Sequence, residues 1–106
     1  MAESEKLTRN WEVRISQPAL KQKKKLPVKV LEILVRLLGD LERKGPIQKS
    51  WTHFSSLDKD KRIPPNAYHC HIKNGRPTYV VCWQVISKKI QIMEIFYVGT
   101  HENAPY

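Results

Sequence analysis

The pattern of apolar and polar residues is most regular in the last third of the chain. Between residues 68 and 73 two sets of side chains alternate, with Tyr68, Cys70 and Ile72 in one set and His69, His71 and Lys73 in the other. A period of two predicts a half-buried strand whose histidines and lysine face outward. Residues 79–86 and 90–98 are rich in β-branched and aromatic residues and predict two more strands. Turns at residues 74–77 and 87–89 would join the three into an antiparallel meander.

The first half of the chain predicts one strand and two helices. Residues 11–16 alternate and predict a strand, with Trp11, Val13 and Ile15 on its apolar face. A helix is predicted over residues 18–25, with Ser16 able to cap it. A longer helix is predicted over residues 27–44, ending before Gly45 and Pro46. Its apolar stripe at helical spacing comprises Leu31, Leu34, Val35, Leu38 and Leu41.

Residues 47–67 have no regular pattern. We expect a short strand over residues 51–54 and a loop from Ser55 onward. His53 receives no functional role, because nothing near it in the sequence completes a site. The order strand, helix, helix, meander predicts an α+β fold with both helices packed on one side of the sheet. Residues 11–106 would form one domain, preceded by a flexible N-terminal arm at residues 1–10.

The charge of the chain points to a polyanionic partner. Its 106 residues carry a formal net charge of +9, which suits nucleic acid, an acidic protein or an anionic membrane surface. No apolar run approaches the ~18 residues of a membrane span, and no secretory signal opens the chain, so we expect a cytoplasmic protein. In that compartment Cys70 and Cys82 are expected to be free, buried thiols.

The outward face of the strand at residues 68–73 is the main candidate for chemistry. His69, His71 and Lys73 would stand about 6.5–7 Å apart and could grip phosphates, or could simply be a solvated face. A zinc site built on the two histidines is disfavoured, because Cys70 points to the opposite face and no carboxylate is near. The tail adds an imidazole at His101 and a phenol at Tyr106.

Two further observations bear on binding. The lysine run that includes Lys24 and Lys25 is either a solvated helix end or a polyanion contact. No P-loop, dinucleotide fingerprint or glycine-framed serine is present, so no small-molecule cofactor is expected.

In the order of its elements, the chain resembles the RelE/ParE superfamily of bacterial toxins, on the RelE and HigB side. The resemblance covers residues 11–106 and rests on three pieces: a Tyr-x-x-x-Ile strand, a Tyr-Val-Val-Cys-Trp-Gln-Val strand and a Val-Gly-Thr-His-Glu tail. It departs from the family where histidines replace lysine and arginine. It departs again at Tyr79 and Val80, where the family often has an arginine.

The resemblance implies a metal-independent endoribonuclease that cuts mRNA in the ribosome and so inhibits translation. It also implies a cognate antitoxin as protein partner. Carried over by position, His101, His69, His71 and Tyr106 are the candidate catalytic residues, and Lys73, Arg76, Lys24 and Lys25 are the candidate RNA-binding residues. In the reaction the ribose 2′-hydroxyl would attack the adjacent phosphorus. A base would take its proton, an acid would protonate the leaving oxygen, and a cation would stabilise the phosphorane. A ParE-like gyrase inhibitor and a non-catalytic basic RNA-binding domain are the alternatives.

Overall fold

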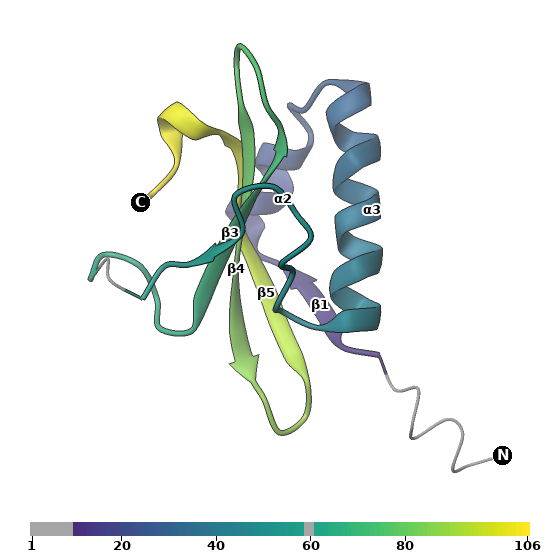
Figure 1. Cartoon of the computed structure of the whole chain (residues 1–106), viewed down its shortest axis with the longest axis vertical. Coiled ribbons are helices and arrows are strands. Elements are labelled where there is room, and N and C mark those ends of the chain that lie inside the picture. Colours follow the sequence, from purple (N-terminus) through teal and green to yellow (C-terminus); the bar gives the residue numbers. More distant parts are fainter. Residues whose placement is uncertain (1–9, 59–60) are drawn as a thin grey trace, which may run out of the picture.

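The computed structural model describes residues 10–58 and 61–106, and within them one mixed sheet has the strand order β1-β5-β4-β3-β2 (Figure 1). The strands are β1 (Glu12–Ile15), β2 (Ser55–Ser56), β3 (Ala67–Lys73), β4 (Tyr79–Ser87) and β5 (Ile92–Thr100). β3, β4 and β5 form the predicted antiparallel meander. β1 lies parallel to β5 at one edge of the sheet, and β2 pairs with β3 at the other.

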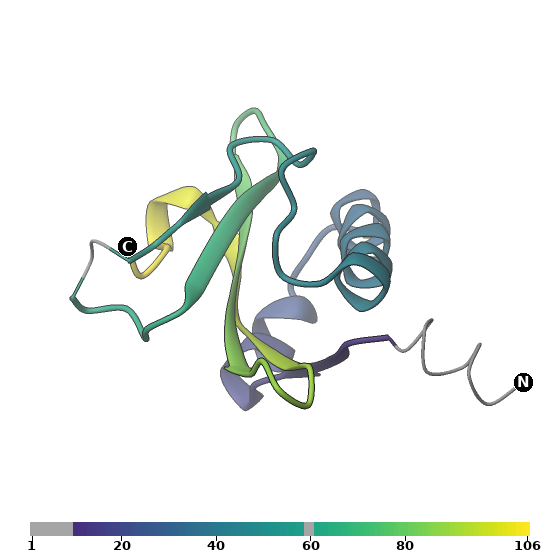
Figure 2. The same cartoon turned by 60° about the horizontal axis from the view of Figure 1, so that its bottom comes forward.

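Both helices cover the same face of the sheet, as predicted. α2 (Gln17–Lys23) packs on β5, and α3 (Val28–Lys44) packs on β3 and β1. Figure 2 shows α3 and the C-terminal segment on opposite sides of the sheet. The backbone N–H of Ala19 donates to Ser16 Oγ over 3.2 Å, so Ser16 is the cap that the sequence predicts. These observations confirm the α+β fold.

The main core lies between the helices and the sheet. α3 buries four side chains that recur at helical spacing: Val30, Leu34, Leu37 and Leu41. Leu31 and Leu38 are only partly buried against this core. Val35 was predicted to be core, and that prediction is wrong, because its side chain is 57% exposed. Val35 follows Leu34 and is therefore rotated by about 100° from the buried face.

A second, smaller core covers the other face of the sheet. It comprises the buried residues Leu57, Ile63, Ala67, Val80, Cys82 and Tyr97, with Ala104 and Tyr106 of the C-terminal tail packed against them. Cys70 belongs to the main core and Cys82 to the second, and burial raises the pKa of each thiol to about 12. Both cysteines are free, as expected. The sheet is thus covered on both sides at its centre, and the solvated outer face, one of the two alternatives for His69, His71 and Lys73, does not describe this centre.

Several predicted boundaries are corrected. Residues 51–54 form turns, and the short strand lies at Ser55–Ser56, which the sequence assigned to a loop. His53 has a positive φ of 55°, and this conformation interrupts an extended strand. β5 begins at Ile92 and continues through Gly99 to Thr100. Residues 1–9 of the predicted arm lie outside the described residues. Within residues 10–58 and 61–106, no helix is long and apolar enough to span a bilayer.

Candidate active site

Four imidazole rings and one phenol ring gather on the face of the sheet that faces away from the helices. We call this group, which comprises His53, His69, His71, His101 and Tyr106, the histidine cluster. Measured between ring centroids, His71 lies 4.4 Å from His53, 5.3 Å from His101 and 5.8 Å from His69. Tyr106 lies 4.6 Å from His69 and 5.7 Å from His101. His71 is therefore the central member.

The cluster joins three segments that are far apart in the sequence. β3 supplies His69 and His71 on alternate positions of one strand face. After β5 the chain enters a single turn of 3-10 helix, η1 (His101–Asn103), which supplies His101. The backbone N–H of His101 donates to the Thr78 carbonyl over 2.8 Å, and this bond fixes the start of η1 beside β4. The tail thus meets the first strand of the meander, as the sequence predicted.

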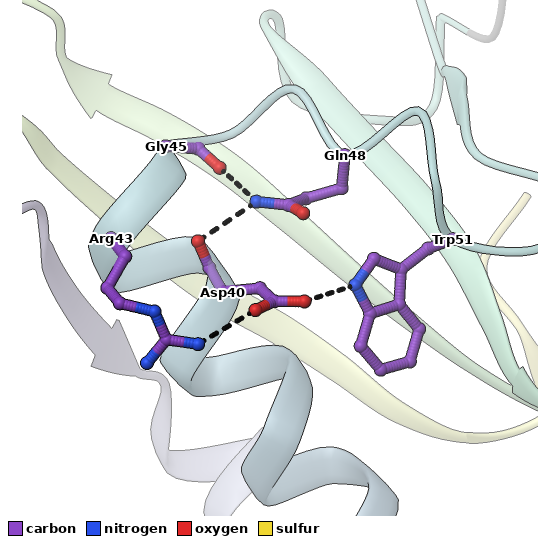
Figure 3. Close-up of polar contacts among 5 residues, drawn as sticks. All are labelled: Asp40, Arg43, Gly45, Gln48 and Trp51. Atoms are coloured by element: carbon purple, nitrogen blue, oxygen red, sulfur yellow. Dashed lines mark hydrogen bonds and ion pairs between the residues drawn. The ribbon is translucent and has the colours of Figure 1, made fainter.

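His53 comes from the loop between α3 and β2 and contacts His71, although no neighbour in the sequence indicates this contact. Two anchors hold this loop against the end of α3 (Figure 3). The buried Gln48 side-chain amide donates to the carbonyls of Asp40 and Gly45, at 3.1 and 2.8 Å. Trp51 Nε1 donates to the Asp40 carboxylate over 2.9 Å.

The same loop is also tied to the sheet. The backbone N–H of His71 donates to the Thr52 carbonyl over 2.8 Å, so the residue that precedes His53 is bound to β3 directly. No local pattern in the sequence signals these anchors, because each partner belongs to a different element. A single histidine between Thr52 and Phe54 carries no periodic signal of its own.

An open cleft of about 670 Å³ lies beside the cluster and presents His71 and His101 to solvent. We call it the first cleft. The β3–β4 turn forms one wall through Gly75, Arg76, Pro77 and Thr78, and η1 forms the other through His101 and Glu102. Arg76, a predicted phosphate-binding residue, is therefore placed next to the histidines. Lys73 is exposed at the end of β3, and the described residues that line the cleft do not include it.

The environment of His71 favours its neutral form. Burial lowers the pKa of this half-buried imidazole, and the nearby His53 and His101 lower it further. A hydrogen bond to Asn74 opposes the shift, with His71 Nδ1 lying 3.1 Å from Asn74 Oδ1. Since an amide oxygen only accepts, Nδ1 carries the proton in this pair and Nε2 keeps its lone pair. Nε2 is thus the atom of neutral His71 that can accept a proton.

His69 occupies a more enclosed position than the sequence predicted. It is only 8% exposed, whereas the alternation placed it on a solvated face. The C-terminal tail causes the difference, because Tyr106 packs over the imidazole. Burial lowers the pKa of His69, and Ser55 is its polar neighbour, with Oγ lying 3.2 Å from Nδ1.

Tyr106 acts as a cover in this arrangement. Its hydroxyl is buried and has no hydrogen-bond partner among the described residues. Burial raises the pKa of the phenol, and the nearby Cys82 and Tyr97 raise it further. The ring contacts two imidazoles while its oxygen lies in an apolar setting. A phenol in such a setting is poorly placed to exchange protons with a substrate in the first cleft.

The two lysines predicted from the basic run lie on the connection between α2 and α3. Lys24 is the C-cap residue of α2, and both Lys24 and Lys25 are exposed. Neither lines the first cleft, but Lys25 lines a second cleft of about 370 Å³. In residues 10–58 and 61–106, no group of three or more His, Cys, Asp or Glu residues is placed to hold a metal ion.

Comparison with known proteins identifies the fold. No family model matches the sequence, and no curated protein matches it either. Three solved structures share the fold over 87–89% of this chain. The isolated E. coli RelE toxin is 23% identical, with 87% of its chain covered and a TM-score of 0.64. The toxin in the archaeal RelE–RelB complex from Pyrococcus horikoshii is 16% identical, with 98% covered and a TM-score of 0.66. A metal-bound toxin from Helicobacter pylori is 18% identical, with 96% covered and a TM-score of 0.61.

Proposed function

We propose that this chain, which has the fold of the RelE toxins, is the toxin of a toxin–antitoxin system and cleaves mRNA on the ribosome, so that translation stops. The observation that carries the proposal is the placing of His71 and His101 at one open cleft, 5.3 Å apart between ring centroids. Arg76 lines the same cleft and supplies a fixed positive charge. Two imidazoles and one guanidinium can supply the base, the acid and the cation of a metal-independent phosphodiester cleavage.

His71 is the general base in the proposed reaction. Its Nδ1 is occupied by Asn74 Oδ1, so Nε2 is the atom that accepts the proton of the ribose 2′-hydroxyl. Its lowered pKa keeps the imidazole neutral, and therefore able to accept that proton, at neutral pH. The 2′-oxygen then attacks the adjacent phosphorus.

His101 is the general acid and donates a proton to the 5′-oxygen that leaves. It lines the first cleft together with His71, so a phosphate bound in the cleft can contact both imidazoles. The Arg76 guanidinium stabilises the negative charge that develops on the phosphoryl oxygens. The products are a 2′,3′-cyclic phosphate and a free 5′-hydroxyl.

The other histidines support His71. His53 packs against its ring, which limits rotation of the His71 imidazole. His69 lies beneath Tyr106 and contacts His71 from within the sheet face. In this scheme Tyr106 and His69 position the reacting imidazoles. Tyr106 and His69 do not touch the RNA themselves, and they act through His71 and His101, which contact it.

The proposal includes a cognate antitoxin and a cytoplasmic site of action. The archaeal neighbour was solved as a complex of RelE with RelB. A chain with a formal net charge of +9 suits an acidic segment of such a partner as well as it suits RNA.

The test is cleavage by the purified chain of RNA that is either free or bound to programmed ribosomes. The parent chain is compared with His71→Asn, His101→Asn and a surface control, Lys88→Ala, which lies in the β4–β5 turn at the far end of the sheet. We expect cleavage by the parent and by the control, with 2′,3′-cyclic phosphate ends and, on free RNA, with no loss in EDTA. Both histidine variants should lose roughly 10²–10⁴-fold in rate.

Three outcomes would contradict the proposal. RNA that is bound but never cut, in either setting, selects the non-catalytic binder. Intact RNA together with inhibited gyrase selects the ParE-like alternative. Cleavage of free RNA that stops in EDTA and returns with a divalent ion rejects the metal-independent reaction.

A further inference from the structure

A second cleft lies on the other side of the η1 turn from the first. It has a volume of about 370 Å³ and is open to solvent on the side of the α2–α3 connection. Its lining includes Gln22 and Lys25 near the α2–α3 connection, Tyr79 of β4, Val98, Gly99 and Thr100 of β5, and Asn103 of η1. Its volume is within the range of about 300–1,000 Å³ that is usual for small-ligand sites.

The second cleft exists because the sheet loses a strand at this point. β1 pairs with β5 only as far as Ile95. Beyond that residue α2 takes the place of β1, and Gln22 Oε1 accepts the backbone N–H of Val98 over 3.0 Å. Further along, Gly99 and Thr100 line the cleft at this edge of the sheet.

The lining offers three different contacts for a nucleotide. Tyr79 is half-buried and supplies an aromatic ring, Asn103 supplies an exposed amide, and Lys25 supplies an exposed ammonium. None of the described residues that line the cleft is acidic. An aromatic ring beside an amide and a lysine suits a base attached to a phosphate, because stacking is tolerant of base identity while the cation binds the backbone.

The two clefts are neighbours along the chain. Thr78 lines the first cleft and Tyr79 the second. In the same way His101 and Glu102 of η1 line the first, and Asn103 lines the second. One turn of 3-10 helix therefore separates the proposed cleavage site from the second cleft. A single strand of RNA that occupies both clefts would pass over this turn.

We propose that the second cleft binds the nucleotide next to the scissile phosphate, with its base against Tyr79 and its far phosphate on Lys25. The proposal rests on the proposed function, since it requires RNA in the first cleft. It gives Lys25 a defined role, and it adds Tyr79 and Asn103 to the RNA-binding surface. It also accounts for an aromatic residue at a position where the resemblance suggested an arginine.

The test uses the full chain, labelled with ¹⁵N, and an RNA trinucleotide that carries 2′-O-methyl groups and so cannot be cut. Lys25→Ala and Tyr79→Leu are compared with the parent and with Lys88→Ala. Leucine at position 79 keeps the contact with the main core and removes the aromatic face. Thermal unfolding of each variant serves as the control for folding.

We expect the trinucleotide to shift the amide resonances of Thr100 and Asn103 together with those of His71 and His101. Tyr79→Leu should weaken binding by roughly 5- to 100-fold and leave its salt dependence unchanged. Lys25→Ala should lower the slope of log affinity against log salt by about 0.7, the contribution of one phosphate contact on a single strand. Lys88→Ala should match the parent.

Two results would overturn the inference, and they separate it from the proposed function. If resonances of His71 and His101 shift while both variants bind as the parent does, RNA uses the first cleft alone and the nuclease proposal stands. If the trinucleotide shifts resonances in neither cleft, the second-cleft assignment fails, and cleavage on programmed ribosomes still decides the proposed function.

Discussion

His53 and His71 lie with their ring centroids 4.4 Å apart, although one belongs to a loop and the other to the sheet. The contact joins a lining residue of the first cleft to a second element, because His71 belongs to β3 and His53 to the loop that Trp51 anchors to α3. Substitution of either His53 or His71 should therefore change the rate of cleavage.

Removal of His53 should slow cleavage less than removal of His71, and the two effects should not add. His71→Asn removes the general base, at a cost of roughly 10²–10⁴-fold. His53→Asn should cost about tenfold in the parent and almost nothing in the His71→Asn background, because it acts through the His71 ring. Single-turnover rates of the four proteins measure this. Fully additive effects would show that His53 contacts the substrate independently.

Asn74→Asp should move the acid limb of the pH–rate profile to higher pH. A carboxylate beside His71 Nδ1 favours the imidazolium, raises the pKa of His71 and reduces the neutral base at a given pH. Asn74→Ala removes a bond that raises this pKa, so its limb should move to lower pH. NMR titration of His71 gives the pKa without reference to activity. If the His71 pKa moves and the rate profile does not, His71 is not the base.

The folded chain should lose stability as the pH falls below about 6.5, the ordinary pKa of histidine. Burial lowers the pKa of His69 and His71, so the unfolded chain binds protons that the folded chain does not. Stability therefore rises with pH between the lowered values and about 6.5, by at most about 1.4 kcal/mol per pH unit for each histidine. Urea unfolding of the parent and of His69→Phe at several pH values measures the slope, which should be shallower in the variant. Equal slopes would contradict this account of His69.

Truncation of the Tyr106 side chain should make His69 more basic. Tyr106→Ala uncovers the imidazole and removes part of the burial that lowers its pKa. NMR titration should show the pKa of His69 moving up toward its ordinary value, with a smaller change at His71. Tyr106→Phe keeps the ring and is the matched control, and its buried hydroxyl has no partner to lose among the described residues. An unchanged His69 pKa in the alanine variant would show that Tyr106 is not its cover.

Trp51→Phe should loosen the loop that carries His53. The variant keeps the aromatic packing and loses the hydrogen bond from Nε1 to the Asp40 carboxylate, at a cost of about 1–2 kcal/mol. That bond is the largest cause of the lowered pKa of Asp40, so the Asp40 pKa should rise in the variant. Arg43→Ala removes an exposed ion pair with the same carboxylate and should cost under about 1 kcal/mol. Urea unfolding and the rate of RNA cleavage measure both effects. Equal stability losses would show that Trp51 is not the anchor.

The parts of the fold that could be predicted are those set by local periodicity. The alternation along β3 assigned Cys70 and Ile72 to the core and brought His69 and His71 to one face, and both assignments match the structure. The N-cap of α2 at Ser16 and the end of α3 at Gly45 could also be predicted, because each depends on residues close by in the sequence. The tail was also predicted to meet β3, and it does so although β4 lies between β3 and β5 in the sheet.

What could not be predicted depends on contacts between distant segments. His53 joins the cluster through Gln48 and Trp51, whose partners on α3 no local pattern indicates. The burial of His69 depends on Tyr106 folding back over the sheet, which alternation along β3 alone cannot show. The roles assigned to His101, His71 and Arg76 in cleavage, and the role of Lys73 in binding, stay predictions.

The missing strand beside the end of β5 has a consequence for how copies of this chain behave in solution. An unpaired strand edge offers backbone groups to which a second chain can add, and this is a common route to aggregation. Here the side-chain oxygen of Gln22 accepts the hydrogen bond that the Val98 N–H would otherwise offer to a second chain. Gln22→Leu would free that donor, and we expect the variant to self-associate at concentrations where the parent is monomeric. The Gln22 side chain thus hinders edge-to-edge pairing at Val98, while Gly99 and Thr100 stay open to the second cleft.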